Sequence, residues 1–164
     1  NDKGYYWRGN AKGCIDNYEG AIDDFSKVIL LKIDDENAFF YRGLANYKLK
    51  KFQTAFNDFT KVLELNSENK YAFYSRGLSN FELKNFQSAI EDYSKAIKID
   101  SNNENLFFLR GLAKFKLDDY EGAIEDYSKE LKLNPRNKNI LKRRSDLYRK
   151  LSEIDIETIQ NTDF

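Results

Sequence analysis

The segment Phe39-Phe40-Tyr41-Arg42-Gly43 decides the fold, because closely similar segments recur along the chain at intervals of 34 residues. An aromatic pair followed one residue later by Arg-Gly also occurs at 5–9, 73–77 and 107–111. A second motif, Ala-x3-aromatic, follows in each copy at Ala21/Phe25, Ala55/Phe59, Ala89/Tyr93 and Ala123/Tyr127. Self-similarity at a fixed period of this kind is the signature of repeat architectures. The sequence therefore predicts four tandem copies without insertions, over 2–35, 36–69, 70–103 and 104–137.

Each copy is predicted to form two α-helices joined by a short polar turn. Apolar residues recur at spacings of three and four, and the alternation typical of a strand is absent. Polar pairs such as Asp16-Asn17 separate the two helices and favour a helix start. A fifth copy begins at Lys138 and then degrades. We expect a capping helix over 138–151, followed over 152–164 by either an acidic tail or an incomplete last helix.

These features resemble the tetratricopeptide repeat family, whose signature combines a 34-residue period with aromatic, Leu-Gly, Ala-x3-Phe and Pro positions. The matching glycines are Gly9, Gly43, Gly77 and Gly111. This chain departs regularly from the pattern, since Arg replaces Leu before each Gly and only Pro135 fills the proline position. The resemblance implies an all-α fold, a right-handed superhelical solenoid of antiparallel helix pairs. It also implies that the first helix of each pair lines a concave face.

The Arg before each Gly is expected to be partly buried, and a buried guanidinium needs a partner. One Asp per copy at a fixed position supplies a carboxylate. The predicted structural ion pairs involve Arg42, Arg76, Arg110 and Arg144 with Asp24, Asp58, Asp92 and Asp126. Pairing could occur within one copy or between neighbouring copies. The sequence favours pairing between copies, because the fifth copy keeps Arg144 although Gln160 stands at its own Asp position. Solvated surface pairs are the alternative.

The concave face is predicted to carry one stripe of side chains from each first helix. The stripe combines the second residue of the aromatic pair with residues four and seven further on, which gives aromatic–Leu–aromatic in three copies. The predicted peptide-binding residues are Tyr6, Asn10, Phe40, Leu44, Tyr47, Tyr74, Leu78, Phe81, Phe108, Leu112, Phe115, Lys142 and Arg149. A large exposed apolar surface is typical of a site for an extended chain or an amphipathic helix. The alternative is that these rings only pack against neighbouring copies.

The C-terminal end of this stripe is expected to be basic. Residues 136–150 contain seven Lys and Arg residues against Asp146, a local balance of +6. A partner with apolar anchors followed by acidic residues or a carboxylate would complement such a groove. The alternative is a charged helix that only solubilises the end of the array. Some members of the resembled family hold a C-terminal carboxylate with Lys and Asn side chains, and only Asn10 matches those positions here.

The composition argues against catalysis, cofactors and metals. The chain has no His, which is the commonest general base, and its single Cys14 cannot build a thiolate cluster. Its 27 basic and 27 acidic residues cancel, so no overall field favours a nucleic acid, and RNA binding through residues 136–150 is the least favoured hypothesis. No apolar run is long enough to span a membrane. Because no Met begins the sequence, we expect a fragment, for which cytosolic and exported locations both stay open.

Two functional hypotheses follow. The first is a non-catalytic protein–protein interaction module that binds a peptide or protein segment in the aromatic groove. The second is structural self-association, in which the chain forms a homo-oligomeric scaffold through the groove, the tail or the terminal copies.

Overall fold

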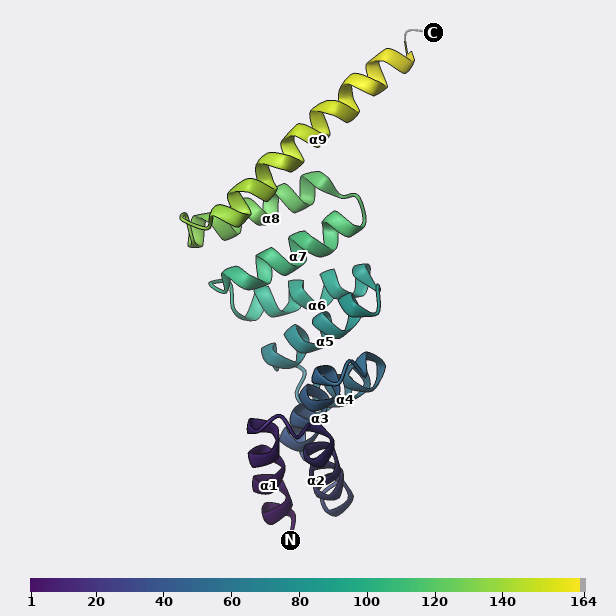
Figure 1. The fold of residues 1–164 in the computed structure, drawn as a ribbon, viewed down its shortest axis with the longest axis vertical. Coiled ribbons are helices and arrows are strands. Elements are labelled where there is room, and N and C mark those ends of the chain that lie inside the picture. The colour runs from purple at the N-terminus through teal and green to yellow at the C-terminus, as the bar shows by residue number, and fades with distance from the viewer. Residues whose placement is uncertain (163–164) are drawn as a thin grey trace. The chain divides into compact units, whose positions relative to one another are not determined.

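The structure, a computed structural model, describes the backbone of residues 1–162 and the side chains of residues 1–154. Within these residues the chain forms nine α-helices and no strand, so the predicted all-α architecture is confirmed (Figure 1). The helices are α1 (Asp2–Cys14), α2 (Tyr18–Leu31), α3 (Glu36–Lys48), α4 (Phe52–Leu65), α5 (Lys70–Glu82), α6 (Phe86–Ile99), α7 (Glu104–Lys116), α8 (Tyr120–Leu133) and α9 (Lys138–Thr162). The chain divides into two compact units, Asn1–Ile99 and Asp100–Phe164.

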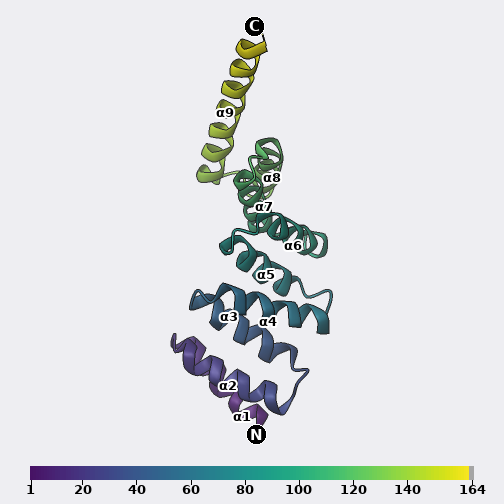
Figure 2. The same ribbon diagram turned by 90° about the vertical axis from the view of Figure 1, so that its right-hand side faces the viewer.

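The first unit consists of three helical hairpins, α1/α2, α3/α4 and α5/α6. Successive hairpins contact each other through α2 with α3 and α4 with α5, and they lie side by side in Figure 1 and Figure 2. The repeated glycine explains how closely the two helices of a hairpin approach. A Cβ on Gly43 would lie 2.8 Å from Cε1 of Phe59, and one on Gly77 would lie 2.6 Å from Cε1 of Tyr93. The rings of Phe59 and Tyr93 are fully buried, so the missing side chain makes room for the core.

The turn inside each hairpin depends on one residue in the left-handed region, which the sequence did not reveal because it is never glycine. These residues recur every 34 positions, with φ of 59° at Asp16, 58° at Lys50, 62° at Lys84 and 60° at Asp118. Each one ends its helix in a Schellman motif. In the first hairpin, the N–H of Asn17 donates to the carbonyl of Lys12 at 2.9 Å, and the N–H of Asp16 donates to that of Gly13 at 3.2 Å.

The second unit contains the α7/α8 hairpin and α9, which packs against α8. Its core joins these elements and consists of Tyr120, Ala123, Ile124, Tyr127, Leu131, Ile140 and Leu147. No helix of the described residues has the length and apolar character needed to cross a bilayer.

Helix α9 includes both the expected capping helix and most of the segment for which the sequence left open an acidic tail or an incomplete last helix. It continues without a break from Lys138 to Thr162 and extends beyond α8 (Figure 1). No Gly or Pro occurs in this stretch, and Ser152 stands where Asp118 forms the left-handed turn of the preceding copy. The helix therefore has no local signal to stop. The last two positions of the expected tail, 163–164, and the side chains of 155–164 lie outside the described residues.

Candidate functional site

Each arginine of the Arg-Gly motif lies against the aspartate of its own hairpin. Nη2 of Arg42 lies 2.6 Å from Oδ1 of Asp58, and its Nε donates to Oδ2 at 3.1 Å. The same two-pronged geometry joins Arg8 to Asp24, Arg76 to Asp92 and Arg110 to Asp126. The predicted pairing of each aspartate with the arginine of the next copy is therefore wrong. The two partners stand 16 residues apart on facing helices, which lets Nε and Nη2 of one guanidinium reach the same carboxylate.

Two of these arginines, and Arg144 of α9, also contact the preceding hairpin, through a hydroxyl group rather than a carboxylate. In each case Nη1 donates to a Ser or Thr oxygen at 3.2–3.3 Å, and the pairs are Arg42–Ser26, Arg76–Thr60 and Arg144–Ser128. This contact accounts for the retention of Arg144 in a copy that lacks the aspartate. The four aspartates are buried. At Asp24 the guanidinium of Arg8, assisted by Lys12 and opposed by burial, holds the pKa of the carboxyl well below its usual range. These clamps hold the scaffold together.

The predicted concave residues of the first unit are all partly buried: Tyr6, Asn10, Phe40, Leu44, Tyr47, Tyr74, Leu78 and Phe81. The rings of Phe40, Tyr47 and Phe81 pack on one side against the second helix of the same hairpin. Ring centroids are 5.8 Å apart for Phe40 and Phe59, and 5.4 Å apart for Tyr47 and Phe52. Phe81 meets Phe86 in the same way at 5.3 Å. One side of each ring is thus fixed by packing, and part of its surface stays accessible.

Two predicted residues of the first unit, Asn10 and Leu44, share a cavity of about 250 Å³ with residues of α1, α2 and α3. Gly9, Phe25 and Tyr41 also line it. The amide of Asn10 is turned back on its own helix, where Nδ2 donates to the carbonyl of Tyr6 at 3.1 Å. This cavity is a mainly apolar recess at the junction of the first two hairpins.

In the second unit, cations of α9 cover the predicted rings. Phe108, Leu112 and Phe115 are partly buried. The guanidinium of Arg143 lies 5.7 Å from the centroid of Phe108, and Nζ of Lys150 lies 5.9 Å from that of Phe115. Such contacts are attractive through the ring quadrupole. Two of the expected basic charges are therefore engaged with aromatic rings.

The remaining predicted residues of α9 are exposed. Lys142 and Arg149 both face solvent. Nη2 of Arg149 lies 2.7 Å from Oδ1 of Asp146 on the same helix. The positive charges of residues 136–150 are therefore partly engaged by neighbouring side chains, which the composition alone did not indicate.

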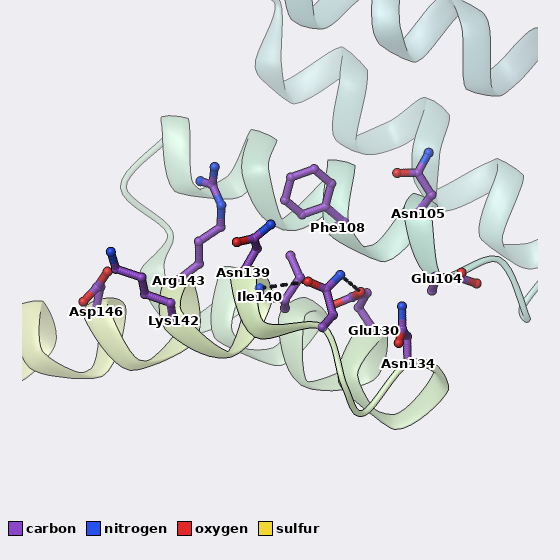
Figure 3. A pocket seen from close by; sticks show the side chains of 11 residues that line it. Glu104, Asn105, Phe108, Glu130, Asn134, Asn139, Ile140, Lys142, Arg143 and Asp146 are labelled. Carbon is purple, nitrogen blue, oxygen red and sulfur yellow. Dashed lines mark hydrogen bonds between the residues drawn. The ribbon is translucent and has the colours of Figure 1, made fainter.

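A cavity of about 810 Å³ lies in the second unit, between the start of α7, the end of α8 and the start of α9 (Figure 3). Lys142, Arg143 and Asp146 stand at one end of it, and Glu104 and Asn134 at the other. The complete lining is Glu104, Asn105, Phe108, Glu130, Asn134, Asn137, Asn139, Ile140, Lys142, Arg143 and Asp146. It is mainly polar, with four amide side chains and charges of both signs. Among the described side chains, no group of three or more Cys, Asp or Glu residues could hold a metal ion.

Glu130 is the residue of this cavity that sequence reasoning missed. Its side chain is 2% exposed, and Oε1 accepts a hydrogen bond from Nδ2 of Asn137 at 2.8 Å. Oε2 has no hydrogen-bond partner among the described residues. Burial raises the pKa of this carboxyl, the charge of Glu104 raises it further, and Asn137 lowers it. The sequence contained a signal for Glu130, because the equivalent positions in the other three copies hold the apolar residues Val28, Val62 and Ala96.

Comparison with known proteins assigns the family. Two tetratricopeptide repeat models match the chain, at residues 71–103 and 105–137. The structure of the Arabidopsis OM64 TPR domain is 32% identical in sequence, with a TM-score of 0.64, over 68% of this chain and 93% of that domain. The chain belongs to the tetratricopeptide repeat family. The expected helical-repeat solenoid is confirmed with it.

Two further tetratricopeptide repeat structures are similar. A MamA crystal structure has a TM-score of 0.80 at 19% identity, over 97% of this chain and 94% of that protein, which shows a shared fold. The first TPR of Spaghetti (RPAP3), bound to the HSP90 peptide SRMEEVD, has a TM-score of 0.67 at 25% identity, over 71% and 93% of the two chains. No curated protein matches the sequence.

Proposed function

We propose that this tetratricopeptide repeat protein is a non-catalytic interaction module whose first helices bind an extended segment of a partner protein. The proposal rests on how the aromatic rings of the predicted concave face are packed and how much of their surface is accessible. Phe40, Tyr47 and Phe81 are each fixed by an aromatic neighbour and yet keep part of their surface accessible. Rings already held in place lose little freedom when a ligand covers them, which favours binding. A peptide is bound by the related Spaghetti repeat domain.

The two units would select different parts of the partner. The predicted concave face of the first unit carries partly buried aromatic and leucine side chains, so it would suit apolar anchor residues. The second unit offers amides and charges of both signs around its cavity, so it suits polar residues. The acidic peptide SRMEEVD is not the ligand we expect here, because the one matching clamp residue, Asn10, already donates to the carbonyl of Tyr6.

A peptide-display selection tests the proposal. Peptides enriched on the wild-type protein are measured against the triple variant Phe40→Ala/Tyr47→Ala/Phe81→Ala. The control variant Ile99→Ala/Leu133→Ala removes apolar side chains that are 46% and 43% exposed at the ends of second helices. We expect at least a tenfold loss of affinity in the triple variant and none in the control, with circular dichroism showing that both stay helical. Equal affinity for all three proteins, or failure to enrich any peptide, would refute the groove.

Self-association is a second candidate, supported by the uncovered surface of the first hairpin. Trp7 is 69% exposed and Leu30 is 84% exposed. In the second copy, Tyr41 occupies the position of Trp7 and stacks on Phe25 of the preceding hairpin, with centroids 5.8 Å apart. Trp7 thus has the character of a residue that packs against another hairpin. Sedimentation of the wild type and of Trp7→Ala/Leu30→Ala decides, since a wild type that stays monomeric at high concentration contradicts this candidate.

A further inference from the structure

Glu130 is anomalous in its own repeat array. Val28, Val62 and Ala96 hold the same place in the other copies, and each of them is at most 1% exposed. A carboxyl group in such a place loses its hydration, and this costs free energy unless hydrogen bonds replace the water. Structural packing would be served better by an apolar side chain. The acid at position 130 therefore needs a reason other than the scaffold.

The surroundings of Glu130 leave half of its hydrogen-bonding capacity unused. An ionised carboxylate can accept at both oxygens, and here only Oε1 is engaged, by the amide of Asn137. Oε2 is buried without a partner among the described residues. The negative charge of Glu104 adds to the effect of burial in raising the pKa of this carboxyl. The arginine and the lysine of the cavity stand at the opposite end, as Figure 3 shows.

The cavity borders the side chain that carries this carboxyl. It is about 810 Å³ in volume, and Glu130 forms part of its lining together with Phe108 and Ile140. The remaining exposure of Glu130 is only 2%, so an incoming group must be slim and must end in N–H donors. A lysine side chain fits this description, since its apolar stem can lie along Phe108 and Ile140 while its ammonium donates hydrogen bonds. A guanidinium is broader and planar.

We propose that this cavity binds a lysine side chain of the partner segment, whose ammonium donates to Oε2 of Glu130 with the carboxylate of Glu104 beside it. The proposal rests on the proposed function and makes it more specific, because it requires a basic residue where the partner crosses the second unit. A metal ion is a poorer occupant, because no acidic or cysteine side chains among the described residues form a group of three or more that could hold one. Free anions are disfavoured by the two carboxylates.

The test uses single blocked amino acids as probes. N-acetyl-lysine methylamide is titrated into the isotope-labelled protein, with shifts of backbone and asparagine amides followed by NMR. The matched probes are the arginine, norleucine and glutamate analogues. We expect saturable shifts at residues 134–143 with the lysine probe, at least tenfold weaker binding of norleucine and glutamate, and intermediate binding of arginine.

Variants locate the effect. Glu130→Gln keeps the shape of the side chain and is expected to weaken the lysine probe at least tenfold. Glu130→Val restores the residue of other copies and should do the same while remaining folded. Glu125→Gln, a control on the same helix with a 63% exposed side chain paired to Lys129, should leave binding unchanged.

Several outcomes would overturn the inference. Equal binding of lysine and norleucine would show an apolar pocket, and stronger binding of glutamate would show that Lys142 and Arg143 dominate. No shifts at all, with Glu130→Gln indistinguishable from wild type, would mean that Oε2 is satisfied by a buried water only. Peptide selection separates this inference from the proposed function. Selected peptides that need Phe40 but not Glu130 would refute the inference alone, and lysine binding without any ring-dependent peptide would refute the proposed function alone.

Discussion

The replacement Gly77→Ala tests whether the repeated glycine is a packing requirement. Alanine at most helix positions stabilises relative to glycine, by about 1 kcal/mol. At Gly77 the added Cβ would lie 2.6 Å from Cε1 and 2.9 Å from Cδ1 of Tyr93. Carbon atoms pack best at about 3.5–4.0 Å, so the ring would have to retreat by about 1 Å. Tyr93 is completely buried, and it has nowhere to go without moving its neighbours.

The expected net effect is a loss of stability. Overpacking a core by one methyl group costs about 1–3 kcal/mol, and the helix preference of alanine returns about 1 kcal/mol of it. Gly77→Ala should therefore destabilise the protein by about 1 kcal/mol. Gly13→Ala is the matched control, because a Cβ at that helical position would meet no atom within 4 Å apart from the neighbouring backbone of its own helix. It should stabilise by about 0.5 kcal/mol. Gly9→Ala, whose Cβ would meet Phe25 at 3.1 Å, should fall between the two.

Urea unfolding followed by far-UV circular dichroism measures these differences. The midpoints and the slopes of the three variants are compared with wild type, because repeat arrays do not always unfold in a single step. The reasoning requires opposite signs for Gly77→Ala and Gly13→Ala. If both replacements stabilise to the same degree, the buried rings have spare room and the glycines are not needed for close approach of the helices.

Three further predictions use the same unfolding measurement. Asp92→Ala should lower the free energy of unfolding by about 3–5 kcal/mol, because Arg76 and Asn80 both donate to this buried carboxylate. The control Glu64→Ala, which removes an exposed pair with Lys61, should lower it by about 0.5 kcal/mol or less. Equal effects of the two replacements would contradict a buried ion pair at Asp92. Tyr93→Phe should stabilise by about 1 kcal/mol, because its buried hydroxyl has no partner among the described residues; a loss would reveal an unseen partner. The free energy of unfolding of wild type relative to Glu130→Gln should fall as the pH rises from about 4 to 7, because the folded-state pKa is raised above an unfolded value of about 4.3. The groups around this carboxyl are the same in both proteins, namely Glu104, Asn137, Lys142 and Arg143. A difference in free energy of unfolding that does not change with pH would show that the Glu130 carboxyl is exposed to water.

The helical repeat could be predicted from the sequence because its determinants are local. Gly43 and Phe59 meet across one hairpin, 16 positions apart, and the same relation returns in every copy. The arginine partner could not be settled in the same way. In an array of identical period, an aspartate of the same copy and one of the preceding copy are equivalent choices on paper. The structure was needed to show that α3 and α4 face each other, so that Arg42 donates to Asp58 through two nitrogens. The third nitrogen of Arg42 donates to the hydroxyl of Ser26 in the preceding hairpin.

The sequence predicted the aromatic stripe of the candidate site but not the polar cavity around Glu130. The stripe of Phe40, Leu44 and Tyr47 follows from helical periodicity. How far each ring is covered depends on neighbours such as Phe52, and on cations such as Arg143 that reach over from another helix. Glu130 required a different comparison, in which each buried position is read down the copies and the single charged exception is noticed.

The joint between hairpins has a consequence for the length of the array. In the first unit, Arg76 meets the hydroxyl of Thr60 just as Arg42 meets that of Ser26. If the codons for residues 36–69 were lost from the gene, Arg76 would lie opposite Ser26. The hydroxyl of Ser26 would then replace that of Thr60 as its partner. Within the first unit, a whole hairpin can thus be lost in one step of 34 residues without losing this arginine–hydroxyl contact.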